Sequence, residues 1–398
     1  MGKVLSYEDQ VDEWVRNGLR RAGTISDLVP RLPGIYPTTI VDSLRRIGVD
    51  IPIGKSERLL RLPGPIPHPV DGDWRFHPES HQLIKDLVQR HGVQALAVLA
   101  SPSLVQPLHG RIGKIALADA NTEWAPYFEN ITIDVCWGDV SLAAHRWPAT
   151  FDCAIVDPPW YPYELRRFLA IATAIVKHSG IVLLSWPAEG TRPGIAQERI
   201  SLIHTARRIG LRYVARKKLA IRYATPFYEA RALQAAGLPV LAGWRRADLV
   251  TFVRDGLPYT DEIDPVHERW KTAKWGNLDL RARESQCENG PADPRLYSVI
   301  DGDVLPTVSQ RDTRRKAAVI WTRANRIFGC HRPELLLAVM DGLARKSSIQ
   351  RSVEETLRRE ATTQEMQWTH EAERQLRLLE AQEAIEYDAL HEAIPARQ

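Results

Sequence analysis

The chain has 398 residues, of which 44% are apolar, and a formal net charge of +4 at neutral pH. This length supports one large core with one or two smaller modules, and the composition is that of an ordinary folded protein. No run of about 18 apolar residues occurs, which argues against a membrane-spanning helix. The net charge is small for this size, so it permits a polyanionic partner without requiring one.

The cysteines and the N-terminus indicate the compartment. Cys136, Cys153, Cys287 and Cys330 lie far apart, with no Cys-x-x-Cys pair, so neither a zinc site nor a disulfide framework is indicated. The first ten residues, MGKVLSYEDQ, lack the apolar stretch of a secretory signal. We therefore expect a cytoplasmic protein that uses no metal and does not insert into a membrane.

Residues 1–62 are expected to form a small helical module. Apolar residues recur at helical spacing in the first 20 positions, and Pro37 suits the first turn of a later helix that Gly48 ends. A short apolar and basic segment, IPIGKSERLLRLPG, follows. This order resembles a winged helix-turn-helix, with Arg45 and Arg46 on the recognition helix. The alternative is a helical cap that packs on the main domain or on a second subunit.

Between residues 71 and 255, buried strands alternate with helical segments. Several of the strands are apolar on both faces, as central parallel strands require. The pattern predicts an α/β fold with a Rossmann-like, doubly wound sheet. A helix is expected over 164–180, before the fifth strand. The strand-like segments are 95–100, 114–120, 131–139, 151–157, 180–186 and 247–253.

Residues 256–345 are expected to be an accessory segment, and residues 346–398 a charged C-terminal helix with a thin apolar seam. The N-terminal or C-terminal helices could join two copies of the chain in a homodimer. Within the accessory segment, Arg314–Lys316, Trp321, Arg323 and Arg326 could form a basic helix face that contacts nucleic acid, although such a face is more often simply solvated.

Four successive strands end in small or acidic residues, and ligands of open parallel sheets bind at these ends. An acid at the second strand end can accept both hydroxyls of a ribose, and an acid at the third can accept from an adenine amine. A tight turn of small residues at the first lets the backbone approach a ligand. The four strand ends are Ser101-Pro102-Ser103, Asp119-Ala120-Asn121, Gly138-Asp139 and Asp157-Pro158-Pro159-Trp160.

The tetrapeptide Asp157–Trp160 has a specific chemical use. The Asp157 carboxylate and the Pro158 carbonyl can both accept hydrogen bonds from an amine, which leaves its lone pair aimed at an electrophilic methyl group. Pro159 stiffens the turn and lacks a competing N–H donor. Trp160 offers a ring face for a planar base or an alkylammonium group. The motif therefore favours methyl transfer to an amine.

The motif resembles that of the amino-methyltransferases, which share [D/N]PP[Y/F/W] at the end of the fourth strand. A longer ordered series is similar to the N6-adenine methyltransferase-like family, a class I family. The resemblance implies S-adenosylmethionine as cofactor, contacted by Ser101, Pro102, Ser103 and Asp119. It also implies an amine held by Asp157 to Trp160, in a pocket lined by Trp74 and Phe76. The series comprises DWRFHPES (73–80), LASPSLVQPL (99–108), DAN (119–121) and FDCAIVDPPW (151–160).

A basic stripe leads into aromatic residues near the expected mouth of the site. Arg222, Tyr223 and Phe227 there could stack on bases and pair with phosphates, or could belong to an ordinary amphipathic segment. The stripe contains Arg207, Arg208, Arg212, Arg216, Lys217, Lys218 and Arg222, with no acidic residue between Ser201 and Tyr223.

The leading hypothesis is thus methylation of an exocyclic amine, adenine in DNA or RNA. A methyltransferase that acts on protein lysine or another amine is the first alternative. The second is a non-catalytic nucleic-acid-binding scaffold whose methyltransferase core has decayed.

Overall fold

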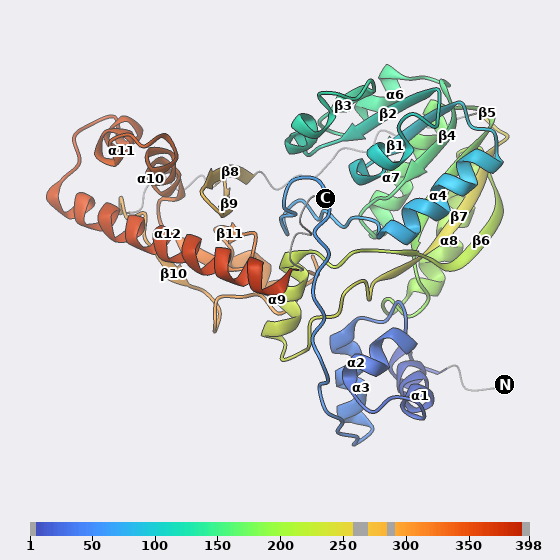
Figure 1. Ribbon diagram of the computed structural model, residues 1–398, viewed down its shortest axis with the longest axis horizontal. Coiled ribbons are helices and arrows are strands. Elements are labelled where there is room, and N and C mark those ends of the chain that lie inside the picture. Colours follow the sequence, from blue (N-terminus) through green and yellow to red (C-terminus); the bar gives the residue numbers. More distant parts are fainter. Residues whose placement is uncertain (1–4, 258–269, 285–290, 392–398) are drawn as a thin grey trace, which may run out of the picture.

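The computed structural model describes residues 5–257, 270–284 and 291–391. They form three units, which Figure 1 shows around a common centre. The central sheet domain lies at the upper right of that view, the N-terminal helices below it, and the C-terminal module at the left. Among the described residues, no helix combines the length and the apolar character needed to cross a bilayer.

The central domain is built on a seven-stranded sheet in the order β3-β2-β1-β4-β5-β7-β6. β7 runs antiparallel to both of its neighbours, and the other pairs are parallel. This is the Rossmann-like methyltransferase sheet predicted from the alternation of strands and helices. The strands are β1 (Ala95–Leu99), β2 (Lys114–Asp119), β3 (Asp134–Trp137), β4 (Phe151–Val156), β5 (Val176–Pro187), β6 (Leu211–Arg222) and β7 (Arg246–Arg254).

Helices cover both faces of this sheet because its central strands are apolar on both sides. In β1, Ala97 and Leu99 face one layer of helices, whereas Leu96 and Val98 face the other. The first layer contains α6 (Leu142–Arg146), α7 (Pro162–Ile175) and α8 (Ile195–Arg208). The second contains α4 (Pro78–Arg90), η2 (Pro102–Leu104), α5 (Val105–Leu108) and η3 (Thr122–Phe128).

The helix predicted over 164–180 ends earlier than expected. α7 stops at Ile175, and residues from Val176 onward belong to β5. Val176 pairs with Phe151 of β4, and a register shift follows. Ser179 has a left-handed backbone, with φ of 63°, which a continuing helix would not permit. Pairing with β4 thus overrides the local helical pattern.

The N-terminal module contains α1 (Tyr7–Leu19), α2 (Ile25–Leu28), η1 (Val29–Arg31) and α3 (Pro37–Arg46). Its hydrophobic core includes residues from outside the module. These are Leu233 of α9 (Phe227–Ala235) and, after that helix, Leu238, Leu241 and Trp244. The segment 49–62 after α3 is extended and forms no hairpin, so a β-wing is absent from this described part.

The cations of α3 are also engaged within the module. Arg46 binds Asp12 at 2.7 Å, and Arg45 binds Asp42 at 3.0 Å. The module therefore packs as a cap on the main domain, which is the alternative considered for it.

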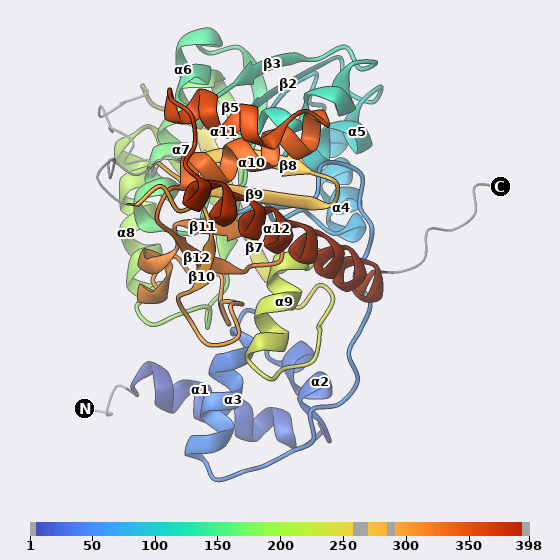
Figure 2. The same cartoon turned by 90° about the vertical axis from the view of Figure 1, so that its left-hand side faces the viewer.

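The C-terminal module combines a second sheet with three helices (Figure 2). Its strands pair antiparallel in the order β10-β12-β11-β9-β8. The helices pack on this sheet in one core, so the accessory segment and the C-terminal helix form a single packed unit. The elements are β8 (Trp270–Trp275), β9 (Leu278–Arg283), β10 (Leu296–Ser298), η4 (Thr313–Ala317), β11 (Ile320–Thr322), β12 (Ile327–Cys330), α10 (Pro333–Arg345), α11 (Ile349–Leu357) and α12 (Thr363–Leu390).

The basic helix face considered around residues 314–326 is not present. Arg323 and Arg326 are buried, 4% and 3% exposed, and Trp321 is fully enclosed. Arg326 contacts Glu383 of α12 at 3.4 Å and Glu386 at 2.6 Å. These arginines therefore neutralise acids of α12 inside the protein and are not available to phosphates. The expectation failed because Arg323 and Arg326 lie in the turn between β11 and β12 and not on a helix, and no sequence pattern shows that this turn is buried.

Glu383 is a suitable residue for testing this buried contact. Glu383→Gln keeps the shape of the side chain but leaves Arg323 and Arg326 without its charge. We expect the free energy of unfolding to fall by about 3 kcal/mol, measured by urea denaturation. The matched control is Glu371→Gln, an exposed residue of the same helix, with an expected change within about 0.5 kcal/mol. Equal effects of the two substitutions would contradict the assigned role.

Candidate active site

The carboxyl ends of β2 and β4 bring Asp119 and Asp157 to one edge of the sheet. Leu99 of the intervening β1 pairs with Ala118 on one side and Val156 on the other. Each acid is the next residue along its strand. Adjacent strands lie about 4.8 Å apart, so the two positions are roughly 10 Å apart. A ligand of nucleoside size can span this distance.

Asp157 is held by two hydroxyl donors on one oxygen. Its Oδ1 accepts from Tyr223 Oη at 2.6 Å and from the hydroxyl of Ser185. Within the described residues, Oδ2 has no hydrogen-bond partner. Burial raises the pKa of Asp157 to about 7, and the two hydroxyls and the Arg245 charge partly offset that rise. The carboxyl group is thus fixed by one oxygen and presents the other.

The rest of the tetrapeptide follows Asp157 in a turn held against β1. The Asp157 N–H donates to Leu99 O at 3.2 Å, which ties the turn to β1. Pro158 is buried, and its carbonyl accepts no hydrogen bond from the described residues. Trp160 is 7% exposed and meets Tyr223 edge to face, with ring centres 5.7 Å apart. Two free acceptors and a ring face therefore lie together, as the sequence suggests.

Asp119 has the environment expected of a ligand to a ribose. It is 8% exposed, and its Oδ1 accepts from the Asn121 N–H at 2.7 Å. Burial, with smaller contributions from the charges of Asp73 and Asp71, raises its pKa to about 7 although the hydrogen bond from the Asn121 N–H lowers it. Hydroxyl donors would stabilise such a carboxylate. Asn121 itself caps η3 by accepting from the Glu123 N–H at 3.0 Å, so its role is structural in this state.

The small-residue turn after β1 is compact and strained. Ala100 has a left-handed φ of 54°, a conformation that costs a non-glycine residue energy. Ser101 Oγ donates to Leu99 O at 3.2 Å, and Ser101 and Pro102 are buried while Ser103 is half-buried. The turn thus offers main-chain groups more readily than side chains.

Asp139, at the third strand end, is less free than expected. It accepts from the Ser141 N–H at 2.8 Å and forms an ion pair with Arg167. The sequence could not reveal Arg167, which comes from the middle of α7.

Aromatic side chains cluster next to Asp157. Trp74 meets Tyr223, Tyr228 and Trp244 edge to face, with ring centres 6.2–6.3 Å apart. Phe76 lies behind Tyr223 at 5.1 Å and is 1% exposed, so it supports the pocket wall. Trp74 and Tyr223 are thus in the cluster as predicted, and Tyr223 binds the catalytic candidate directly.

Three polar residues near this pocket were not singled out from the sequence. Ser185 lies near the carboxyl end of β5, two residues before Pro187, and could have been found as a polar residue close to a strand end. Asp73 begins the predicted aromatic segment, and its carboxylate binds Arg75 at 2.9 Å. Arg245 has no motif around it, so only the fold reveals that it lies near Asp157.

Arg222 and Phe227 lie outside the aromatic cluster. Arg222 binds Glu79 at 3.2 Å and donates to the Gly243 carbonyl at 3.1 Å, which anchors the loop before β7. Phe227 packs on Tyr387 of α12, with ring centres 5.2 Å apart. Both side chains therefore hold surrounding segments together.

The basic stripe begins at the end of α8 and runs along the edge strand β6, and several of its cations form ion pairs. Arg216 contacts Glu189 at 3.2 Å, and Arg212 contacts Asp255 at 2.8 Å. Charged side chains on an edge strand also hinder pairing with other chains, which is a structural use for them.

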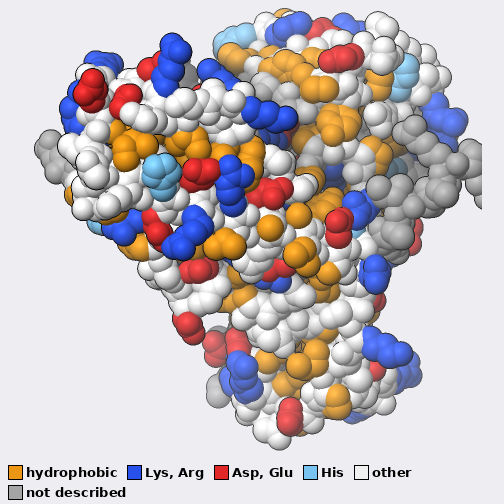
Figure 3. All heavy atoms as spheres, turned by 60° about the vertical axis from the view of Figure 1, so that its left-hand side comes forward, with side chains coloured by type: hydrophobic (Ala, Val, Ile, Leu, Met, Phe, Trp, Pro, Cys, Tyr) orange, Lys and Arg blue, Asp and Glu red, His pale blue; other side chains and the backbone are white. Residues whose placement is uncertain are grey.

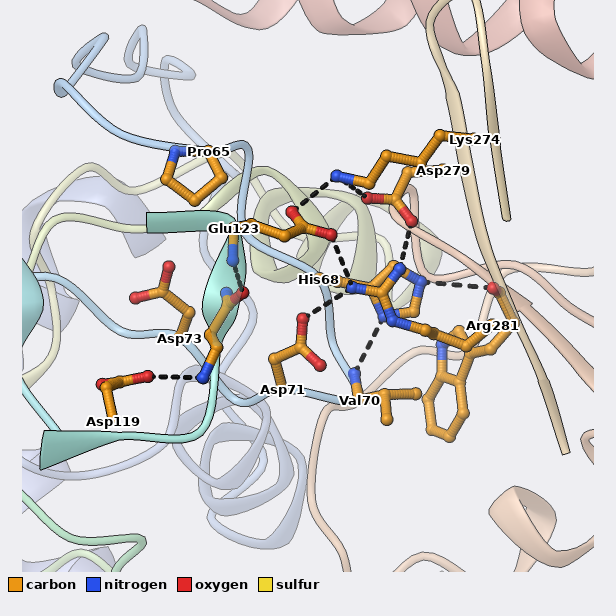
Figure 4. A network of polar contacts seen from close by, with 12 residues as sticks. Pro65, His68, Val70, Asp71, Asp73, Asp119, Glu123, Lys274, Asp279 and Arg281 are labelled. Atoms are coloured by element: carbon orange, nitrogen blue, oxygen red, sulfur yellow. Dashed lines mark hydrogen bonds and ion pairs between the residues drawn. The ribbon is translucent and has the colours of Figure 1, made fainter. Parts of the chain in front are cut away.

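The C-terminal module is joined to the Asp119 edge by a polar network (Figure 4). Lys274 of β8 binds Glu123 at 2.5 Å, and Arg281 of β9 binds Asp71 at 2.8 Å. His68 accepts from the Val70 N–H at Nδ1 and lies 3.2 Å from the Trp321 carbonyl through Nε2. Nε2 is therefore the protonated nitrogen, and burial lowers the pKa of His68 well below its ordinary value.

No family model matches the chain, and no curated protein does. Among solved structures, it is similar to a branched-chain polyamine synthase mutein from Thermus thermophilus, with 15% identity, 64% of this chain and 92% of that chain covered, and a TM-score of 0.48. The 16S rRNA N2 G1207 methyltransferase of the same organism is 14% identical to this chain. That match covers 60% of this chain and 57% of that chain, with a TM-score of 0.32. An N-methyltransferase from Bradyrhizobium japonicum is 10% identical. That match covers 45% of this chain and 89% of that chain, with a TM-score of 0.30. Such values do not bear on the reaction, and the fold assignment depends on the strand order of this chain.

The raised pKa of Asp157 predicts a pH-dependent stability. The folded protein keeps a proton to about pH 7, whereas the unfolded chain loses it near 3.8. The stability from this group is full at low pH and is lost as the pH rises through 7. Asp157→Asn cannot ionise, so we expect its free energy of unfolding to fall less than that of the wild type between pH 5 and 8. Urea denaturation at several pH values measures the free energy of unfolding of both proteins.

Asp255→Asn, at an exposed carboxylate beyond β7, is the control and should follow the wild-type profile. Parallel profiles for the wild type and Asp157→Asn would show that Asp157 ionises normally.

Proposed function

We propose that this chain is an S-adenosylmethionine-dependent methyltransferase that acts on an exocyclic amine, adenine in DNA or RNA. The observation that carries the proposal is the half-satisfied carboxyl group of Asp157. One of its oxygens is fixed by two hydroxyls, and the other has no hydrogen-bond partner among the residues that the structure describes. A carboxylate in this state accepts a hydrogen bond from an amine and orients it.

Different residues of the chain bind the cofactor and the acceptor. Asp119 accepts hydrogen bonds from ribose hydroxyls, and the turn 101–103 faces the amino-acid part of the cofactor. Asp157 Oδ2 and the Pro158 carbonyl take the two hydrogens of the acceptor amine, which directs its lone pair outward. The cofactor supplies the electrophilic methyl group. A proton then leaves the methylated nitrogen, and ionised Asp157 is the nearest base in this arrangement.

A flat acceptor is favoured by the rings of Trp74 and Trp160. The centres of both rings lie within 4.2 Å of the guanidinium carbon of Arg245, and we name the position of this flat group on the two rings the acceptor slot. Purine rings stack on such faces. A slender alkylammonium group would use less of this surface, which makes a protein lysine acceptor the second choice.

On the face that Figure 3 shows, the charge pattern supports a local contact with nucleic acid in preference to a broad one. Figure 3 shows basic and acidic side chains interspersed on one face of the protein, with no continuous basic area. An extruded or single-stranded base suits this pocket better than a base inside a duplex.

A labelling experiment tests the acceptor class. The protein is incubated with tritiated S-adenosylmethionine and a cell extract, and the nucleic acid and protein fractions are counted separately. Label in nucleic acid is the expected result, and label confined to protein would favour the lysine alternative. No label together with no cofactor binding by calorimetry would favour the non-catalytic scaffold.

Asp157→Ala removes the acceptor for the amine while leaving the cofactor side intact. We expect the rate of methyl transfer to fall by about 100-fold or more, with little change in cofactor affinity. Methyl transfer is measured with the labelled cofactor, and affinity by calorimetry. Unchanged turnover would refute the role given to Asp157.

Asp119→Ala should have the opposite pattern. It removes charge-assisted hydrogen bonds to the ribose, so we expect the cofactor Kd to rise by about tenfold to 100-fold. Glu164→Ala, at an acid on the neighbouring α7, is a control for general loss of negative charge. If Asp119→Ala binds the cofactor as tightly as the wild type, the ribose site lies elsewhere.

A further inference from the structure

Arg245 lies on the ring that the proposed function gives to the acceptor. Its guanidinium carbon is 4.0 Å from the centre of the Trp160 ring and 4.2 Å from that of Trp74. The Tyr223 ring is 5.8 Å away. Trp160 is only 7% exposed, so little of its ring is open while the guanidinium lies over it. A flat acceptor cannot stack there until this group has moved.

The guanidinium is held by ring faces alone. Within the described residues, no hydrogen bond or ion pair joins Arg245 to a carboxylate. Arginine normally binds a nearby carboxylate through two parallel N–H···O bonds. Contacts with ring faces leave its five N–H donors unused, so a ligand that stacks well can replace it.

A partner for the displaced group is present close by. Glu229 in the first turn of α9 is fully buried, and neither of its carboxylate oxygens has a hydrogen-bond partner. Its environment includes the Tyr36 phenol and the positive charge of Arg245. Burial raises the pKa of Glu229 to about 7, and the Tyr36 phenol and then the Arg245 charge oppose that rise. Within the described residues, a buried acid without an ion-pair partner therefore lies within electrostatic reach of a cation that also has none.

We propose that Arg245 is a displaceable occupant of the acceptor slot, which moves from the face of Trp160 to Glu229 when a flat acceptor binds. The identity of that acceptor rests on the proposed function, whereas the occupancy of the slot does not. Arg245 is then a specificity-determining residue. An acceptor with a broad π face replaces the guanidinium, and a slender alkyl amine is excluded because it offers too little contact in exchange.

Arg245→Met tests this role, because it keeps the length of the side chain and removes the planar cation. Methylguanidinium serves as a probe that can refill the slot, and its binding is measured by saturation-transfer NMR. We expect saturable binding to Arg245→Met and none to the wild type or to Arg246→Met, the adjacent arginine at the start of β7. Equal binding to the wild type and Arg245→Met would overturn the proposal.

Kinetics provide a second measurement with the nucleic-acid acceptor. We expect the KM of Arg245→Met for the acceptor to fall by about tenfold, which corresponds to about 1.4 kcal/mol, at an unchanged cofactor Kd. Methylguanidinium should raise that KM again by competition. Glu229→Gln, which removes the charge that receives the guanidinium, should raise the KM of the otherwise unaltered protein.

A higher KM in Arg245→Met would show that Arg245 binds the acceptor, and the proposal would fail. If label enters only protein in the extract experiment, the proposed acceptor is wrong. The methylguanidinium measurement still decides the role of Arg245 in that case, so the two failures can be told apart.

Discussion

The carboxyl group of Asp157 lies half-buried at the end of a strand, where the surrounding protein replaces much of the water that would solvate its charge. This constraint organises the surrounding structure. Ser185 comes from β5 and Tyr223 is the residue after β6, and both donate to one oxygen of this group. Removing a carboxylate from water is costly unless such donors replace the water. The sheet must therefore hold these strands in register for the site to exist.

The same requirement explains why the site is rigid on one side and open on the other. The aromatic residues behind Tyr223 are nearly inaccessible, so the phenol cannot move away from Asp157. The second carboxylate oxygen and the Pro158 carbonyl remain available. A group that is fixed through one atom and free at the next is suited to orienting a ligand, because orientation requires no rearrangement of the protein.

The sequence was informative where a local pattern controls the structure. Buried strands that alternate with helices predicted the sheet, and the acids at their ends predicted Asp119 and Asp157. It was less informative where contacts between distant segments decide the outcome. Asp139 is paired with Arg167 of α7, and Arg323 and Arg326 are paired with acids of α12. Partners some 28 to 60 residues away leave no periodic signal in the chain.

The candidate pocket shows the same division. Trp74 and Tyr223 were identified because they belong to aromatic segments near the motif. Arg245 was missed because a single arginine before a strand has no distinguishing pattern. Its place over two tryptophans depends on how β7 is inserted between β5 and β6.

α9 contacts both the N-terminal helices and the C-terminal module, through different residues. Leu233 completes the core of the N-terminal helices, while Phe227 and Ala230 contact residues near the end of α12. The N-terminal core is incomplete without this nine-residue helix, whereas the main core of the C-terminal module contains no residue of α9. The loss of α9 would therefore expose the N-terminal core and the end of α12. A fragment cut at residue 60 would leave an apolar surface in water, and it would tend to aggregate more than to fold independently.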